Sequence, residues 1–530
     1  MGSAMYRNLI LYLSIIAVVL ALHSETQSQG PAPQLNRFVE GIDAAEKSMP
    51  AAEAAAQLND PWGAQVLRKG IFPASIDEVL AAIDKLNQGN AGLPHQSSFF
   101  ISESGQIPAN ANPAPQREFR MVVTRSPGND SSIILVSAPA GDRTGFIELM
   151  SWDASKQAFN FYRRPRTPNW DWKGDSNAAF QTGSIGRGCF ACHVHGAPIM
   201  KELHRPWSNC HSEVATIPPD VITDAAIRTS PLFTQRSRAN ELEPVLIGWI
   251  NKSVTAHVAT AAKTGTVSSP PDLLRPLFQT TTINLESSNA ISSGSSAPVD
   301  LPYSFFVNND LLGNVLGIDL AGLGARPTVA RNLYQAALTK FDFHLADDTF
   351  SRKGDTYFAF LVPAASVADT RTVGELIVQK VVTWHFAASV AMVDFPNPVF
   401  SPLRSRLLQY VPATAPSVGP ELSDAAAKKI VAAAANLPAN SAERRFAEYW
   451  KLSDDQLKAR AAKELKDYFD AVRKRLATQA GFDDYTRLAQ SRRDHFAATP
   501  LNESELKLLL PKTNIPKAEL RMNADGSVTH

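Results

Sequence analysis

The spacing of apolar residues changes along the chain, and each change predicts a different kind of structure. After residue 31, apolar positions recur every three or four residues, which is typical of amphipathic helices. The segments that show this period are 37–47, 51–58 and 76–86. Ser75 stands directly before the last of them, where its hydroxyl can cap the first turn of a helix. A helix-rich N-terminal segment is therefore expected.

From residue 97 the period shortens to two, which is typical of strands with one buried face. Four short runs rich in β-branched and aromatic residues alternate in this way, at 118–124, 131–137, 145–152 and 158–163. Glycine, proline, asparagine and aspartate lie between the runs, and these residue types favour tight turns. Short strands joined by short turns predict an antiparallel β-meander.

The second half of the chain returns to a helical period, with fewer strands. The predicted helices lie at 241–257, 328–339, 373–393, 402–408, 423–435 and 441–477. The predicted strands lie at 280–285 and 304–307, on either side of a serine-rich loop at 287–296. A proline-rich linker at 412–420 divides this half, and the residues from Pro511 onward have the composition of an irregular tail.

A glycine-studded loop at 183–188 leads from the meander into the one short motif that carries recognisable chemistry. Cys189, Cys192 and His193 read C-x-x-C-H. Two thiols at this spacing can each form a thioether with a haem vinyl group, and the imidazole that follows can bind the iron. The spacing therefore predicts one covalent haem c, with His193 as an axial ligand.

At these residues the chain resembles c-type cytochromes. The resemblance implies thioether attachment at Cys189 and Cys192 and iron ligation at His193. The order of a β-meander followed by C-x-x-C-H is similar to that of cytochrome P460 and its β-sheet relatives. In those proteins an open haem rests against a sheet and acts on nitrogen oxides or hydroxylamine. Residues 194–530 follow the motif here, which departs from that pattern.

The start of the chain predicts export. Residues 1–8 carry Arg7, residues 9–22 are apolar, and a polar stretch follows to residue 30, as in a secretory signal peptide. The apolar run is shorter than a membrane span. We expect cleavage after Ser24 or Ser28, with an uncleaved anchor as the alternative. Because haem is attached to C-x-x-C-H outside the bacterial cytoplasm, the signal and the motif both predict a periplasmic protein.

Together these patterns predict an α+β fold, with an antiparallel β-meander followed by a c-type haem loop between a helix-rich N-terminal segment and a helix-rich C-terminal half. The expected division is a signal peptide at 1–28, a helical segment at 31–95, the meander and haem-attachment region at 96–215, a mostly helical domain completing the haem pocket at 216–411, and a helical extension at 412–530.

The balance of charge and the number of cysteines limit the partners and metal sites that can be expected. The chain has 52 basic and 51 acidic residues, so no nucleic acid or anionic membrane surface is expected as a partner. Its three cysteines do not suggest a disulfide framework, and Cys210 is left over if two hold haem. Two rival interpretations remain: a zinc site of Cys189, Cys192, Cys210 and His211, and a thioredoxin-like dithiol.

The sixth position on the iron decides what such a haem can do. Candidate ligands are His385 and Met392 on the predicted helix 373–393, and Met200, His204 and His211 soon after the motif. His195 is expected to point away from the iron, and His257 to end a helix as a favourable cation. Two arginines flank the motif and could pair with the haem propionates: Arg187 and Arg205.

These features favour an exported monohaem cytochrome with a redox role. An open sixth position would make it a haem-dependent oxidoreductase acting on a small molecule. An occupied position would make it a periplasmic electron carrier or subunit, and a haem-based sensor is a further alternative. The expected partners are a periplasmic electron donor or acceptor and a small-molecule substrate. No membrane span is expected unless the signal peptide stays uncleaved.

Overall fold

The computed structural model describes residues 32–88, 93, 95–102, 118–126, 134–197, 202–203, 217, 222–238, 241–263, 269–288, 296–346, 350–353, 360–414, 419–499 and 509–530. The predicted signal peptide at 1–28 lies outside these residues. Within them, no helix is both long enough and apolar enough to cross a bilayer.

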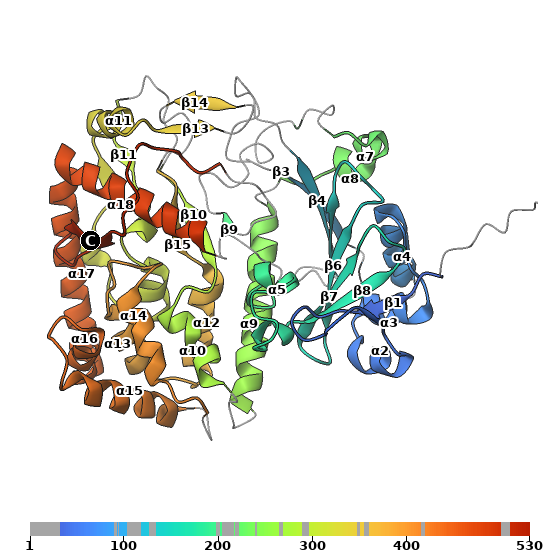
Figure 1. Cartoon of the computed structure of the whole chain (residues 1–530), viewed down its shortest axis with the longest axis horizontal. Coiled ribbons are helices and arrows are strands. Elements are labelled where there is room, and N and C mark those ends of the chain that lie inside the picture. Colours follow the sequence, from blue (N-terminus) through green and yellow to red (C-terminus); the bar gives the residue numbers. More distant parts are fainter. Residues whose placement is uncertain are drawn as a thin grey trace, which may run out of the picture.

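An eight-stranded sheet dominates one side of the molecule, on the right in Figure 1. Its strands are β1 (Leu35–Arg37), β2 (Lys47–Ser48), β3 (His95–Ser102), β4 (Phe119–Ser126), β5 (Ile134–Pro139), β6 (Ile147–Asp153), β7 (Ala158–Arg164) and β8 (Trp170–Asp175). The strand order is β2-β1-β8-β7-β6-β5-β4-β3, and neighbours from β3 to β8 pair antiparallel. The predicted meander is confirmed, and β3 and β8 extend it at both ends.

Successive side chains of β7 point to opposite faces of the sheet, which are covered differently. On the outer face lie α2 (Ala51–Gln57), α3 (Pro61–Gln65), the 3₁₀ turn η1 (Leu67–Lys69) and α4 (Ile76–Gln88). Tyr162 faces this layer and donates to the buried Asp60, which caps α3. On the inner face, Phe159 stacks on Trp249 at 5.1 Å. The inner face therefore meets the rest of the molecule.

The predicted helix at 37–47 is wrong, whereas those at 51–58 and 76–86 are confirmed as α2 and α4. Residues 35–37 form β1, which pairs parallel with β8, from Leu35↔Trp170 to Arg37↔Trp172. The backbone amides of this segment thus find partners in the sheet rather than in a helical turn. Ser75 accepts from the amide of Glu78, as expected for the cap of α4.

The second half of the chain forms a lobe made mostly of helices, on the left in Figure 1. Its longer helices are α9 (Leu242–Lys263), α10 (Pro270–Phe278), α11 (Arg331–Lys340), α12 (Val367–Val378), α13 (Trp384–Met392), α15 (Pro420–Ala434), α16 (Ala442–Trp450), α17 (Asp454–Leu476) and α18 (Gln479–Ala498). The shorter helical pieces of this lobe are η5 (Tyr303–Phe305), η6 (Asp310–Val315), η7 (Ala321–Leu323), α14 (Pro402–Arg406) and η8 (Leu407–Tyr410). Two more, α7 (Ala225–Thr229) and α8 (Pro231–Thr234), lie beside the sheet and contribute to its core (Figure 1).

Several short strands connect these helices. β10 (Ile283–Glu286) lies between β15 (Val362–Ala365) and β9 (Glu202–Leu203) in a three-stranded sheet. Three two-stranded sheets complete the list: β11 (Val299–Asp300) with β12 (Thr328–Val329), β13 (His344–Ala346) with β14 (Ser351–Lys353), and β16 (Arg521–Met522) with β17 (Val528–Thr529). The strand predicted at 280–285 is confirmed as β10, and the C-terminal tail contains the last of these sheets.

Helix α9 belongs to the cores of both lobes. Its Trp249 packs in the core of the sheet lobe, whereas Ile250, Val254 and Val258 are buried in the core of the helical lobe. Figure 1 shows α9 standing between the sheet and the other helices. Residues on both sides of the predicted boundary at 411–412 contribute to the one helical core. The sheet and the helical lobe are therefore joined through a shared apolar helix.

Three predictions for the helical lobe are wrong in detail. The predicted strand at 304–307 is the 3₁₀ turn η5, and Phe305, Phe306 and Val307 are all fully buried rather than alternating. The predicted helix 373–393 is two helices, α12 and α13, and Lys380 between them has a φ of 58°. Its apolar pattern runs across the break because both helices are buried.

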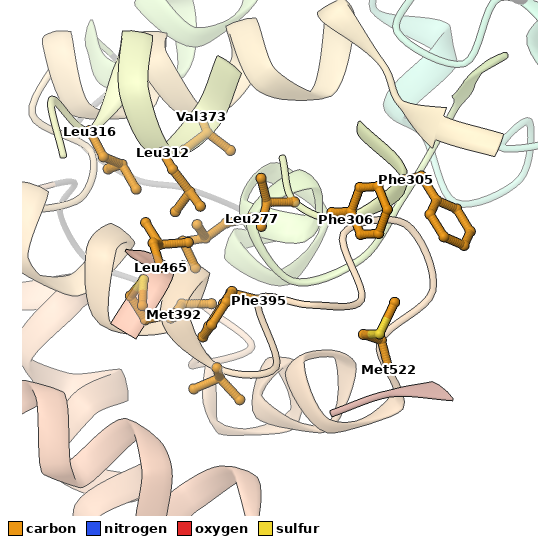
Figure 2. Packing of buried hydrophobic residues seen from close by; sticks show 14 of the residues in the cluster. Leu277, Phe305, Phe306, Leu312, Leu316, Val373, Met392, Phe395, Leu465 and Met522 are labelled. Carbon is orange, nitrogen blue, oxygen red and sulfur yellow. The ribbon is translucent and has the colours of Figure 1, made fainter. Parts of the chain in front are cut away.

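The predicted helix 441–477 is also two helices, α16 and α17. A new helix begins after Ser453, whose side chain and Gln456 form a reciprocal capping box. Helix α18 was not predicted at all, although it is one of the longest helices of the lobe. Figure 2 shows buried apolar side chains of the helical core, among them Phe306, Met392 and Leu465.

Candidate functional site

The two cysteines of the motif lie on one helical turn, α5 (Cys189–Cys192), at the inner face of the sheet. Gly188 caps this turn with a φ of 53°, and a Cβ there would lie 2.3 Å from a carboxylate oxygen of Glu40. Only glycine fits this position without strain. Cys189 and Cys192 are partly buried and are not joined in a disulfide.

The ring of His193 is held in one orientation. Its Nδ1 lies 2.7 Å from the carbonyl oxygen of Ala197, and because a carbonyl only accepts, Nδ1 carries the proton. The lone pair of Nε2 is then available, which is the arrangement that metal-binding histidines usually adopt. Burial lowers the pKa of His193, so the ring favours its neutral, ligating form. Phe161 of β7 packs beside the ring at 5.3 Å between centroids.

A cluster of charged residues lies on the sheet next to the motif. Arg163 of β7 contacts Glu148 of β6 at 2.5 Å, and Arg120 of β4 approaches the same carboxylate at 3.5 Å. Ser137 accepts from Arg120 at 3.0 Å. We call Arg120, Glu148 and Arg163 the Glu148 cluster. Its charges act on the pKa of His193, so the cluster lies within electrostatic range of that ring.

A second ion pair also lies near the motif. Lys173 of β8 is 4 % exposed at its side chain and contacts Glu40 at 2.5 Å. The same Glu40 packs against Gly188. Arg163 and Lys173 are therefore inward-facing cations close to Cys189, and they could balance the carboxylates of a bound group.

Burial and nearby acids raise the pKa of the Cys189 thiol to about 12, with Glu148 and Glu40 adding to the effect of burial. The thiol is therefore protonated at neutral pH. Reactive C-x-x-C dithiols have the opposite property, a lowered thiol pKa that gives a nucleophilic thiolate. This environment disfavours the thioredoxin-like interpretation of the motif.

The structure does not bring His385 and Met392 to the motif. His385 lies on α13, where Nδ1 is 2.7 Å from Asp454 and Nε2 is 3.1 Å from the carbonyl oxygen of Trp450. Met392 is buried in the helical core near Leu465 (Figure 2). Helix α13 lies in the helical lobe, on the far side of α9 from α5 (Figure 1).

The remaining predicted residues lie at the surface, in the interior, or in parts that the structure does not describe. Arg187 is exposed directly before α5, with its Cδ lying over Gly41. His195 is buried and hydrogen-bonded to Asp369 of α12. The following residues lie outside the described residues: Met200, His204, Arg205, Cys210 and His211.

Sequence reasoning missed most of the charged surroundings. A signal for one pair was present, because the hairpin over the turn 153–157 pairs Asp153 with Ala158 and so places Glu148 opposite Arg163. Lys173 lies on β8, which precedes the motif, and Asp369 contacts His195 from α12, which is distant in sequence. For the zinc interpretation, the described residues contain no group of three His, Cys, Asp or Glu suited to a metal ion, and two of its proposed ligands lie outside them.

His257 lies inside α9 rather than at its end, and it is buried, so the expectation that it ends a helix as a favourable cation is wrong. Its ring stacks on Phe180, in the 3₁₀ turn η2 (Ala178–Phe180) that precedes the motif, at 3.5 Å between centroids. Burial, assisted by His195, lowers the pKa of His257 from 6.5 to about 4. The unfolded chain therefore binds more protons between pH 6.5 and pH 4, and stability falls as the pH drops through this range, by up to about 3 kcal/mol.

The His257→Phe variant keeps an aromatic ring on Phe180 but cannot take up this proton. We expect it to lose less stability than the parent chain between pH 7 and pH 4, as measured by urea unfolding at each pH. The difference between the two chains then reports the proton that His257 takes up on unfolding. Parallel losses in the two chains would show that His257 titrates normally in the folded state.

Comparisons with known proteins do not supply a relative. Scans of protein-family models, of curated proteins and of solved structures each found no match to this chain. The geometry around Cys189, Cys192 and His193 is therefore the basis for any statement about function.

Proposed function

We propose that this chain is an exported monohaem c-type cytochrome with a redox role. Cys189 and Cys192 hold one haem through thioethers, and Nε2 of His193 binds the iron. The observation that supports this most directly is the hydrogen bond from Nδ1 of His193 to the carbonyl of Ala197, which directs the Nε2 lone pair to a ligand. The two thiols precede this ring on a single turn, at the spacing that haem attachment needs.

The charged residues at the sheet suit this role. A haem bound here supplies one-electron redox chemistry at its iron. Arg163 and Lys173 lie near Cys189 and offer cations to the haem carboxylates. Glu148 lies between two arginines and can accept a hydrogen bond from a substrate at its carboxylate oxygens. Because of these groups, we favour a haem-dependent oxidoreductase that acts on a small molecule.

The size of the molecule favours an enzyme over an electron carrier. An electron carrier with a single haem does not need a second lobe with its own large core. Here that lobe reaches the motif directly, because Ala197 is buried in the helical core and His195 bonds to α12. We therefore propose that the helical lobe helps to form the haem pocket and leaves the sixth position of the iron open.

Carbon monoxide tests this proposal. The reduced protein is expected to bind carbon monoxide immediately, with a shift of the Soret band, because the described candidates for a sixth ligand, His385 and Met392, lie in the helical lobe away from the motif. The His385→Gln and Met392→Leu variants are expected to bind it equally well. If carbon monoxide leaves the spectrum of the reduced protein unchanged, the result would favour an electron carrier. If metal analysis finds one zinc and no iron, haem binding would be overturned.

A further inference from the structure

We propose that His195 is a positioning residue for the axial ligand. Through Asp369 and Thr281 it ties the turn that carries His193 to the helical lobe, and it thereby fixes the hydrogen bond that orients the His193 ring. The inference rests on the proposed function, because it concerns the haem iron that His193 would bind. It assigns a role to the buried pair His195 and Asp369, which lies outside the haem-attachment motif.

The residues after α5 form a tight turn. The amide of Gly196 donates to the carbonyl of His193 at 2.8 Å, and the carbonyl of Ala197 accepts from the His193 ring. The position of Ala197 therefore decides how strong the bond to Nδ1 is. Any group that holds this turn also controls the orientation of the axial ring.

His195 is anchored at the centre of this turn. Its Nε2 lies 2.9 Å from Oδ1 of Asp369 and 2.8 Å from the hydroxyl of Thr281. Side-chain exposure is only 6 % for His195 and 8 % for Asp369. An ionised carboxylate only accepts hydrogen bonds, so Nε2 carries the proton and donates it to Asp369. Buried pairs of this kind are costly to break, because the partner is left unsatisfied.

Asp369 is itself fixed by several bonds. It lies in the first turn of α12, where its amide donates to the capping hydroxyl of Ser366 at 3.0 Å. Its Oδ2 accepts from the amide of Thr281 at 2.9 Å, and its Oδ1 accepts from the hydroxyl of Thr281. The start of α12, the residues before β10 and the turn after the motif thus meet at one carboxylate. We call His195, Thr281 and Asp369 the Asp369 clasp.

The other side of the turn is held by the sheet lobe and α9. The carbonyl of Gly196 accepts from Ser176 at 2.6 Å and from Ser253 of α9 at 3.3 Å. Gly196 has a φ of 61°, and a Cβ there would lie 2.5 Å from the carbonyl of Ser176. The turn therefore has no room to shift toward the sheet. The Asp369 clasp holds it by hydrogen bonds from the helical side, where Ala197 is also buried in the helical core.

Releasing the clasp has a predictable electronic effect. A loosened turn lengthens the bond between Nδ1 of His193 and Ala197. The ring then donates less electron density, because the hydrogen bond at Nδ1 raises the basicity of the ligand. A weaker donor stabilises the oxidised iron less, so the reduction potential rises.

The experiment compares the purified, haem-loaded parent with three variants by spectroelectrochemical titration. His195→Leu removes the clasp, and His195→Gln keeps an amide donor near the position of Nε2. His385→Leu is the matched control, because it removes another histidine–aspartate pair, with a separation of 2.7 Å, from a distant part of the helical lobe. Haem content is measured in every sample.

We expect His195→Leu to shift the reduction equilibrium toward the ferrous form at least threefold, which is about 28 mV for one electron at about 59 mV per tenfold. His195→Gln is expected to restore most of the parent value, and His385→Leu to leave it unchanged. If His195→Leu does not fold, Thr281→Val takes its place in the experiment, because this substitution removes only the hydroxyl of the clasp. Thr281→Val is expected to shift the reduction potential in the same direction.

The outcomes separate this inference from the proposed function. Full haem loading with an unchanged potential in His195→Leu, or in Thr281→Val where it stands in, would overturn the positioning role alone. An equal shift in His385→Leu would also overturn it, because the effect would then be general loosening. Absence of haem from the parent chain would overturn the proposed function, and the inference with it.

Discussion

Mass spectrometry of the mature, denatured protein is expected to show the added mass of one haem, and the Cys189→Ala/Cys192→Ala variant is expected to show none. Thioether bonds survive denaturation, whereas a haem held only by His193 is lost when the chain unfolds. On a denaturing gel, the parent band should stain for haem-linked peroxidase activity and the variant band should not.

Cys210 provides a matched control for this experiment. Under the proposed function, Cys210→Ala keeps its covalent haem, because this cysteine takes no part in attachment. Under the zinc interpretation, the same substitution removes a metal ligand and lowers the zinc content. A colourless parent protein whose mass equals that of its amino acids would refute covalent haem attachment.

The Phe306→Ala variant is expected to destabilise the helical lobe by about 3–5 kcal/mol, which is the usual cost of truncating a fully buried phenylalanine. Phe306 is completely buried and packs against Phe305, Phe469 and Tyr485 at 5.0 to 6.0 Å between ring centroids. Figure 2 shows its ring within the apolar cluster. Urea unfolding, followed by circular dichroism at the helical band, measures the loss.

Two further variants calibrate this measurement. Phe306→Leu keeps most of the apolar volume and is expected to lose clearly less stability than Phe306→Ala. Val378→Ala alters a side chain that is 69 % exposed at the end of α12, and it is expected to change stability by less than about 0.5 kcal/mol. Equal losses at positions 306 and 378 would contradict the packing described for the helical core.

The sheet was predictable because its strands are consecutive and their turns are local. The alternation at 118–124, 131–137, 145–152 and 158–163 corresponds to β4, β5, β6 and β7, each paired with the next. The N-terminal strand β1 could not be found in this way. It joins the sheet beside β8, more than a hundred residues later, and its own pattern resembles that of a helix.

The helical lobe shows where periodicity fails. A helix buried on all sides loses the contrast between its faces, so the sequence gives no sign of where α12 ends and α13 begins. The turn at η5 was predicted as a strand because aromatic residues favour strands, but here three successive side chains are buried. Tertiary packing overrides the local preference in both cases.

The candidate site divides in the same manner. Cys189, Cys192 and His193 could be identified from the sequence because their chemistry depends on spacing within five residues. Glu148 and Arg163 required the register of β6 and β7, which the turn between them sets. Candidate ligands such as His385 and Met392 could not be assessed before the fold placed them in the helical lobe.

The sequence by itself determined the local features of this protein: an alternating meander, amphipathic helices, and a motif with the spacing for haem attachment. Each of these depends on residues close together in the chain. Only the tertiary structure decided that His195 meets Asp369 and that α9 joins two cores. Such contacts form between distant segments, and the burial that makes them favourable exists only when the whole chain has folded.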